Sequence, residues 1–157
     1  MNPNIGITAK NLKSLHELLN KTLADEMILY IKTRKYHWNV SGESFMELHK
    51  LFEEQYNKLE KTIDEIAERI GKLGGMAFGT TKEFASTSQL KEAPGKNPSS
   101  KEIRNELLKD HETIIKSLRD RIDDADEKFE DAGTADLLTS VMRTHETIAW
   151  TLRRYGL

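Results

Sequence analysis

The sequence predicts an all-α fold, a four-helix bundle with a long crossover that carries a short extra helix. Three observations predict it: apolar residues recur at helical spacing along four long segments, prolines number only three, and glycines gather between the second and third segments. A chain of 157 residues suffices for one domain with a core but not comfortably for two. We expect a single domain over 1–157, with helices at about 8–38, 44–71, 100–131 and 134–154.

The first helix has a candidate N-cap, Thr8, and an apolar pattern that runs to about Trp38. Its expected buried residues are Leu12, Leu15, Leu18, Leu19, Leu23, Met27 and Ile31. Residues 39–42 break the helical pattern, and Ser41 or Ser44 could cap the next helix.

The second helix has the clearest pattern, because eight apolar residues fall within a sector roughly 80° wide on a helical wheel. They are Phe45, Leu48, Phe52, Tyr56, Leu59, Ile63, Ile66 and Ile70. Gly71, Gly74 and Gly75 are expected to end this helix. Residues 76–98 then form a crossover long enough to span a bundle, with a short helix near residues 81–90.

The third helix is predicted to begin at a capping box of Ser99 and Glu102 and to end near Gly133. Thr134 can start the fourth helix. The expected buried residues are Ile103, Leu107, Ile114, Leu118 and Ile122 on the third, and Leu137, Val141, Ile148 and Leu152 on the fourth. Two helices, a long crossover and two more helices form a ferritin-like arrangement. Coiled-coil packing is the alternative, but the glycine-rich middle favours a closed bundle.

Composition narrows the functional classes. The net charge of −2 gives no long-range attraction for nucleic acid, and the absence of cysteine excludes disulfides and thiolate metal sites. No stretch approaches the roughly 20 apolar residues needed to cross a bilayer, and the N-terminal residues do not resemble a signal peptide. We therefore expect a cytoplasmic protein that makes no membrane contact.

The residues with metal-binding chemistry lie close together in the sequence. They are His37, His49, Glu53, Asp64 and Glu68. On the second helix, His49 and Glu53 are four residues apart, as are Asp64 and Glu68, so each pair shares a face. These four residues lie within about 100° of one another, roughly 110° from the apolar stripe. Imidazole and carboxylate together suit first-row metals such as iron.

The two pairs cannot share one metal within a single helix. Glu53 and Asp64 are about 16 Å apart along the axis, whereas a metal–oxygen bond is about 2 Å long. However, the midpoint of 49 and 68 is 58.5, and so is the midpoint of 53 and 64. A two-fold axis at that point brings His49 and Glu53 of one chain level with Glu68 and Asp64 of another. The spacing therefore predicts two equivalent sites, on the order of 20 Å apart, that exist only in a dimer.

Each of these residues also has a structural alternative. With 26 acidic residues, carboxylate pairs four apart arise by chance and are usually balanced by Lys or Arg. His49 could rest beside Phe45 and Phe52, and His37 could cap the C-terminus of the first helix. The shared midpoint, with two histidines nearby, favours the metal site.

These residues resemble the signature of the Dps family of miniferritins, and the resemblance covers nearly the whole chain. The matching segments are residues 37–42 (HWNVSG), Phe45, Leu48-His49, Phe52-Glu53, residues 64–69 (DEIAER), residues 134–139 (TADLLT) and Trp150. The resemblance implies a ferroxidase that oxidises Fe(II) with hydrogen peroxide, with oxygen as a slower oxidant, and stores ferric mineral. It also implies a homo-oligomer, a hollow dodecamer built from dimers.

The resemblance also assigns the ligands. His37 and His49 of one subunit, with Glu53 beside them, would bind iron together with Asp64 and Glu68 of a two-fold partner. The family often has aspartate at the position of Glu53, and the longer side chain could alter the weaker metal position.

Further roles follow from the same resemblance. Trp38 would lie beside the iron centre, where it could quench radicals, with an aromatic plug packed under the site as the alternative. Glu54 is a candidate for mineral nucleation on the inner wall. Asp131 and Asp136 are candidates for acidic pores at three-fold axes, with solvated surface acids as the alternative.

Larger ferritins carry Glu-x-x-His motifs directed into the bundle core. No histidine here has a glutamate three residues before it, so an iron site within one subunit is disfavoured. His16, His111 and His145 are expected to be structural or surface residues.

Two other functions compete with iron oxidation. The Dps name refers to DNA binding, but the segment before Thr8 has no Lys or Arg, and only three residues follow Arg154. We therefore expect weak or absent DNA binding, because phosphate neutralisation needs several flexible cations. The other alternative is a helical structural protein whose acids hold no metal.

Overall fold

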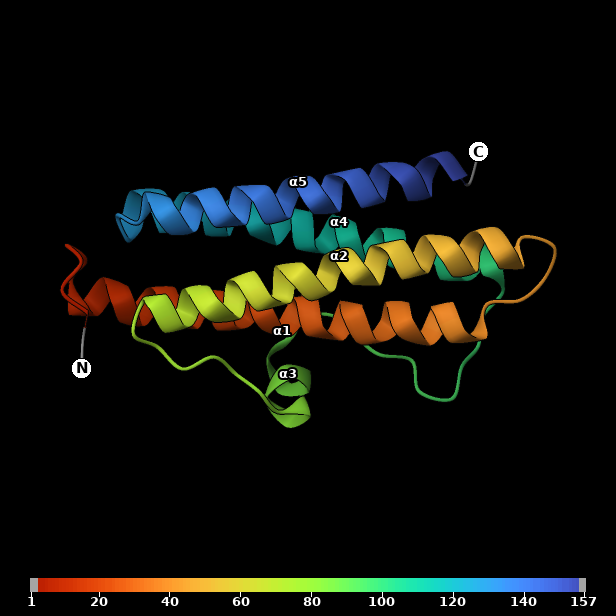
Figure 1. Ribbon diagram of the computed structural model, residues 1–157, viewed down its shortest axis with the longest axis horizontal. Coiled ribbons are helices and arrows are strands. Elements are labelled where there is room, and N and C mark those ends of the chain that lie inside the picture. The colour runs from red at the N-terminus through yellow and green to blue at the C-terminus, as the bar shows by residue number, and fades with distance from the viewer. Residues whose placement is uncertain (1–2, 156–157) are drawn as a thin grey trace.

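The computed structural model describes residues 3–155 and confirms the all-α prediction (Figure 1). Its helices are α1 (Ala9–Asn39), α2 (Phe45–Lys72), α3 (Thr81–Thr87), α4 (Ser100–Asp123) and α5 (Ala132–Tyr155). A π-helical turn, Asp124–Lys128, follows α4 directly. No described helix is long and apolar enough to cross a membrane.

The bundle consists of two antiparallel helix pairs, α1 with α2 and α4 with α5 (Figure 1). The crossover carries α3 along the outer side of α1. Buried side chains of α1 hold it there: the Asn20 amide bonds the backbone of Met76 and Phe78, and the Asp25 carboxylate accepts hydrogen bonds from Ser88 and Gln89. The crossover is therefore fixed to the bundle.

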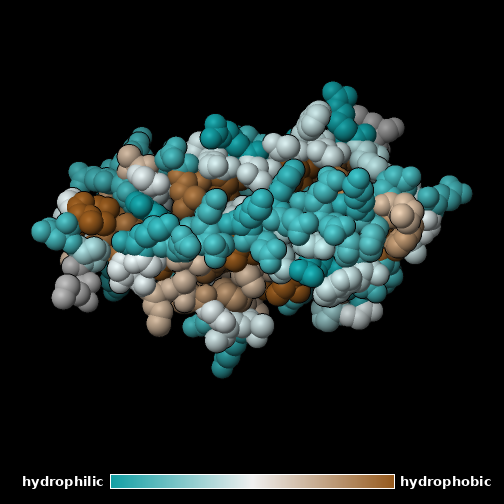
Figure 2. All heavy atoms as spheres, in the orientation of Figure 1, coloured by the Kyte–Doolittle hydropathy of each residue, from teal (hydrophilic) through white to brown (hydrophobic). Residues whose placement is uncertain are grey.

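Apolar side chains from all four long helices form one core, as the predicted stripes require. The prediction of burial is wrong for two residues of those stripes: Ile31 is 36% exposed and Phe45 is 38% exposed. Both lie toward the end of the bundle where α1 turns into α2. Elsewhere hydrophilic residues cover much of the face that Figure 2 shows.

The predicted caps are largely confirmed. The Thr8 side chain accepts a hydrogen bond from the Asn11 amide, and Ser99 and Glu102 form the capping box of α4. The Ser44 side chain makes no capping hydrogen bond at α2. A second capping box, formed by Thr80 and Glu83, starts α3.

The junction between α4 and α5 differs from the prediction. Regular α-helix ends at Asp123, not near residue 131, and Glu130 adopts a φ of 56° that ends the helical path. α5 begins at Ala132, so Gly133 lies inside its first turn. Space explains the glycine: a Cβ at Gly133 would lie 2.9 Å from the Arg69 guanidinium, which crosses this turn to reach Asp131.

Candidate metal centre

His37 and His49 are held together where α1 gives way to α2. His37 lies in the last turn of α1 and His49 near the start of α2. The imidazole rings stack with centroids 3.7 Å apart and an interplanar angle of 20°. His37 Nδ1 lies 2.7 Å from the His49 carbonyl oxygen, and His49 Nδ1 lies 2.8 Å from the His37 carbonyl oxygen.

These reciprocal hydrogen bonds determine which nitrogen of each ring carries the proton. A carbonyl oxygen can only accept, so each Nδ1 must carry the proton and donate it. In a neutral imidazole, Nε2 then holds the lone pair that binds a metal. Such a hydrogen bond at the other nitrogen is the usual way a protein orients a histidine ligand. The hairpin of α1 and α2 thus leaves two imidazole Nε2 atoms able to bind a metal.

Aromatic side chains surround the imidazole pair. Tyr56 meets His37 edge-on with centroids 5.2 Å apart, and Phe45 lies 5.1 Å from His49. The expected alternative contact between Phe45 and His49 is therefore present, and it is compatible with metal binding because ring packing leaves the Nε2 lone pair in the ring plane. His37 is only 8% exposed.

The three acids lie exposed on α2, and Glu53 follows His49 by one turn. Asp64 and Glu68 lie further along, where Glu68 forms an ion pair with Lys72 at 2.9 Å. A surface hollow beside Asp64 is lined by Glu60, Lys61, Ile63, Asp64 and Ala67. Across residues 3–155 of one subunit, no three His, Asp or Glu side chains are grouped to hold a metal ion. One subunit brings the histidines together and leaves Asp64 and Glu68 apart from them.

Trp38 is 64% exposed, so within one subunit it is not a plug packed under the imidazoles. The Arg34 guanidinium lies 5.6 Å from its ring centroid and 4.5 Å from that of Tyr56. Arg34 also donates a hydrogen bond to the Tyr30 hydroxyl. The face next to His37 therefore presents an aromatic and cationic surface.

The acids expected at pores and at the mineral surface lie in different environments. Glu54 and Asp136 are exposed, whereas Asp131 is 6% exposed and is not a solvated surface acid. Both Asp131 oxygens lie 2.8 Å from Arg69 Nη2, and Thr134 donates to one of them. Burial raises the pKa of Asp131, but the hydrogen bonds from Thr134 and Arg69 outweigh it and lower the pKa overall. Of the two predicted pore acids, Asp131 is thus engaged within the subunit.

His111 and His145 are structural residues, as expected, whereas Glu26 was not singled out from the sequence. Glu26, His111 and His145 are each 0% exposed in the bundle core. His111 lies between Leu107 and Ile114 at helical spacing, so its place on an apolar stripe was a usable signal. His16 is structural as expected, since its Nε2 lies 2.9 Å from the Leu73 carbonyl oxygen.

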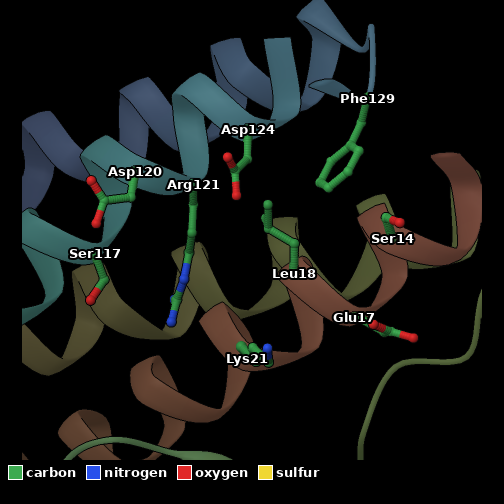
Figure 3. Close-up of a pocket in the computed structure, with 9 residues that line it drawn as sticks. All are labelled: Ser14, Glu17, Leu18, Lys21, Ser117, Asp120, Arg121, Asp124 and Phe129. Atoms are coloured by element: carbon green, nitrogen blue, oxygen red, sulfur yellow. The ribbon is translucent and has the colours of Figure 1, made fainter. Parts of the chain in front are cut away.

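A cavity of about 380 Å³ between α1 and α4 lies apart from the metal-binding candidates (Figure 3). Its lining includes Glu17, Lys21 and Asp120. Arg121 also borders it and donates hydrogen bonds to Asp25 and Thr22, each at 3.0 Å. None of the predicted ligands lines this cavity.

Comparison with known proteins defines the class. The family described as the ferritin-like domain matches residues 16–155. A low temperature-induced protein of Nostoc sp. is 46% identical over 152 residues, covering 97% of this chain and 85% of that protein. The chain therefore belongs to the ferritin-like family.

Solved structures narrow the class further. DpsC from Streptomyces coelicolor is 32% identical, with a TM-score of 0.95 over 100% of this chain and 91% of the other. The Dps protein from Vibrio cholerae, described as a member of a superfamily of ferritin-like diiron-carboxylate proteins, is 30% identical, with a TM-score of 0.91 over 98% and 96%. Within the ferritin-like family, the chain is a Dps miniferritin.

Proposed function

We propose that this protein is a ferroxidase that takes up Fe(II) as substrate and stores it as ferric mineral. The observation that carries the proposal is the reciprocal hydrogen bonding of His37 and His49, which leaves both Nε2 lone pairs for a metal. Glu53, one turn from His49, would add a carboxylate. The remaining ligands, Asp64 and Glu68, would come from a second copy of the chain.

Helix geometry supports the two-fold arrangement. α2 is a continuous helix through residue 58, so the spacing of its side chains follows the regular rise of about 1.5 Å per residue. In an antiparallel pair of α2 helices, the exposed Asp64 and Glu68 of one copy lie level with Glu53 and His49 of the other. The Glu68–Lys72 ion pair does not oppose this, because an exposed pair is worth at most about 1 kcal/mol.

The ligand set suits the reaction. Carboxylate oxygens favour the more highly charged Fe(III) over Fe(II), so they assist loss of an electron. Hydrogen peroxide would be the preferred oxidant and oxygen a slower one. Two Fe(II), one hydrogen peroxide and two water molecules give two FeO(OH) and four protons. Trp38 is placed on the surface beside His37, where it could supply an electron to a reactive oxygen product.

Storage requires assembly beyond the dimer. We propose a hollow dodecamer in which Glu54 faces the mineral and Asp136 lines the pores through which iron passes. Asp131 would support such a pore by fixing the first turn of α5 through Arg69 and Thr134.

Complementation between two inactive chains tests the shared site. One chain would carry His37→Ala and His49→Ala, and the other Asp64→Asn and Glu68→Gln. Each alone is expected to be inactive, whereas random co-assembly should restore about a quarter of the wild-type rate of Fe(II) oxidation, because half the dimers are mixed and each has one intact site of two. Rates would be measured by the absorbance of ferric product after addition of peroxide.

The control for complementation is the same pair of chains purified separately and mixed without reassembly, which should stay inactive. A co-assembled sample that is equally inactive, with both chains present by mass spectrometry, would show that the ligands are not divided between subunits.

DNA binding is proposed to be weak. Of the two cations near the C-terminus, Arg153 is already paired with Glu112 at 2.7 Å. In a gel-shift titration of the intact oligomer, we expect no retention of duplex DNA at roughly 150 mM salt, since few flexible cations are available to neutralise phosphates. Tight retention that survives this salt would contradict the expectation.

A further inference from the structure

A chain of three titratable side chains crosses the bundle core. Glu26 of α1, His145 of α5 and His111 of α4 are each 0% exposed. His145 Nε2 lies 2.7 Å from Glu26 Oε1, and His145 Nδ1 lies 2.7 Å from His111 Nδ1. The chain therefore links three of the four long helices through two short hydrogen bonds.

The outer polar atoms of Glu26 and His111 have no hydrogen-bond partner among the described residues. Among the described residues, Glu26 Oε2, His111 Nε2 and both amide atoms of Gln55 are buried without a hydrogen bond. His37 contacts His49, so these two residues set the register of the antiparallel helices α1 and α2. Six residues further along α2, Gln55 is therefore level with residue 31 of α1. Lys32 bonds Asp110, which places His111 within about one turn of the same level. Near this level of the bundle α2 thus contributes the uncharged amide of Gln55.

The geometry limits how many protons the chain can hold. A contact of 2.7 Å between two nitrogens has room for one hydrogen, which one nitrogen donates and the other accepts. When Glu26 is ionised, a protonated His145 can donate through Nε2 to Glu26 and through Nδ1 to a neutral His111. One further proton would give His111 an N–H at Nδ1, opposite the N–H of His145. The hydrogen bond would then be replaced by two like charges in the core.

We propose that the Glu26–His145–His111 chain is an acid-sensitive lock of the helical bundle. Near neutral pH it joins α1, α4 and α5 through the two short hydrogen bonds of His145. In mild acid the bundle resists a positive charge on the buried His111, so stability is lost. The proposal does not depend on iron binding, because none of the three residues belongs to the candidate metal centre.

The other buried titratable groups on the surrounding helices have partners of their own. Asp25 bonds Arg121, Lys32 bonds Asp110, Tyr36 bonds Glu106, His37 bonds the His49 carbonyl, and Tyr56 contacts Arg34. None of these contacts supplies a charge to His111.

The direction of the pH effect follows from burial. Desolvation, with the nearby charge of His145, holds the pKa of His111 well below its ordinary value of 6.5. The unfolded chain takes up this proton near pH 6.5 and the folded chain does not. The contribution to stability is therefore complete above pH 6.5 and decreases as the pH falls below it.

The first test follows exchange of the imidazole Cε1 hydrogen by mass spectrometry in the iron-free assembled protein, across pH 4.5–8.5. We expect the His111 midpoint to lie at least about one pH unit below that of the same residue in urea-unfolded protein. Coincident midpoints would overturn the proposal, and the measurement needs no substitution.

The second test compares thermal unfolding at pH 7.5 and pH 5.0. The wild-type midpoint is expected to fall by about 5 °C more than that of His111→Gln, which cannot take up the proton. The matched control is His16→Gln, which changes a histidine that takes no part in the Glu26–His145–His111 contacts. Its unfolding midpoint should fall as much as that of the wild type. An equal fall in His111→Gln would refute the lock. If that variant does not fold, the exchange measurement decides alone.

Discussion

Replacing His37 and His49 together with alanine is expected to lower the initial rate of peroxide-driven Fe(II) oxidation by about 100-fold or more. Loss of hydrogen bonds around a metal ligand already costs about 10- to 100-fold, and this change removes two proposed ligands. The rate would be measured at limiting Fe(II) by stopped-flow absorbance. Assembly should survive, because the two rings lie at one end of the α1–α2 pair and the core beneath them is apolar.

The matched control for this prediction is His16→Ala, which removes a histidine bonded to the Leu73 carbonyl and far from the site in sequence. It should oxidise Fe(II) at nearly the wild-type rate. Size-exclusion chromatography of each variant would separate lost chemistry from lost assembly. An assembled double variant with an undiminished rate would rule out the two histidines as iron ligands.

Lys32→Met is expected to lower the free energy of unfolding by about 3 kcal/mol at neutral pH. Lys32 is 4% exposed, and its Nζ lies 2.5 Å from Asp110 Oδ2 and 2.9 Å from the Lys91 carbonyl oxygen. Burial raises the pKa of Asp110 even though Lys32 lowers it, so the carboxylate depends on this cation. Without Lys32 the charged carboxylate would remain buried and unpaired, and urea unfolding would measure the loss.

Two further variants isolate the pair. Adding Asp110→Asn to Lys32→Met should recover much of the loss, because the orphaned charge is removed. The loss should also shrink in acid, since protonation of Asp110 neutralises it. Lys21→Met, at an exposed position of α1, should change stability by less than about 0.5 kcal/mol. If Lys32→Met changed the stability as little as Lys21→Met, the buried pair would have no stabilising role.

Local sequence spacing accounts for much of the fold. Helical periodicity predicted the four long helices, and Thr8 and the Ser99–Glu102 pair marked two helix starts by hydrogen bonds that span only three residues. The junction after α4 was mispredicted because its geometry depends on distant residues. Asp131 is fixed by Arg69, 62 residues away, and that contact also explains Gly133.

The same difference between nearby and distant residues applies to the candidate site. The histidines of α1 and α2 are 12 residues apart, within the span of one helical hairpin, and the structure brings them into contact. The buried Glu26–His145 contact joins residues 119 positions apart, which no local pattern can reveal. Pairing with Asp64 and Glu68 of a second chain stays a prediction, because it concerns an interface between copies.

The reciprocal bonding of the two imidazoles has a consequence for the order of events during biogenesis. In the proposed dimer, one half of each iron site would form as soon as the α1–α2 hairpin closes, whereas the other half would come only with a second polypeptide. Occupancy and self-association are then thermodynamically linked, so ferrous iron would tighten the pairing of subunits by mass action. Scarce iron would leave the same protein with a looser pairing and an idle, preorganised half-site.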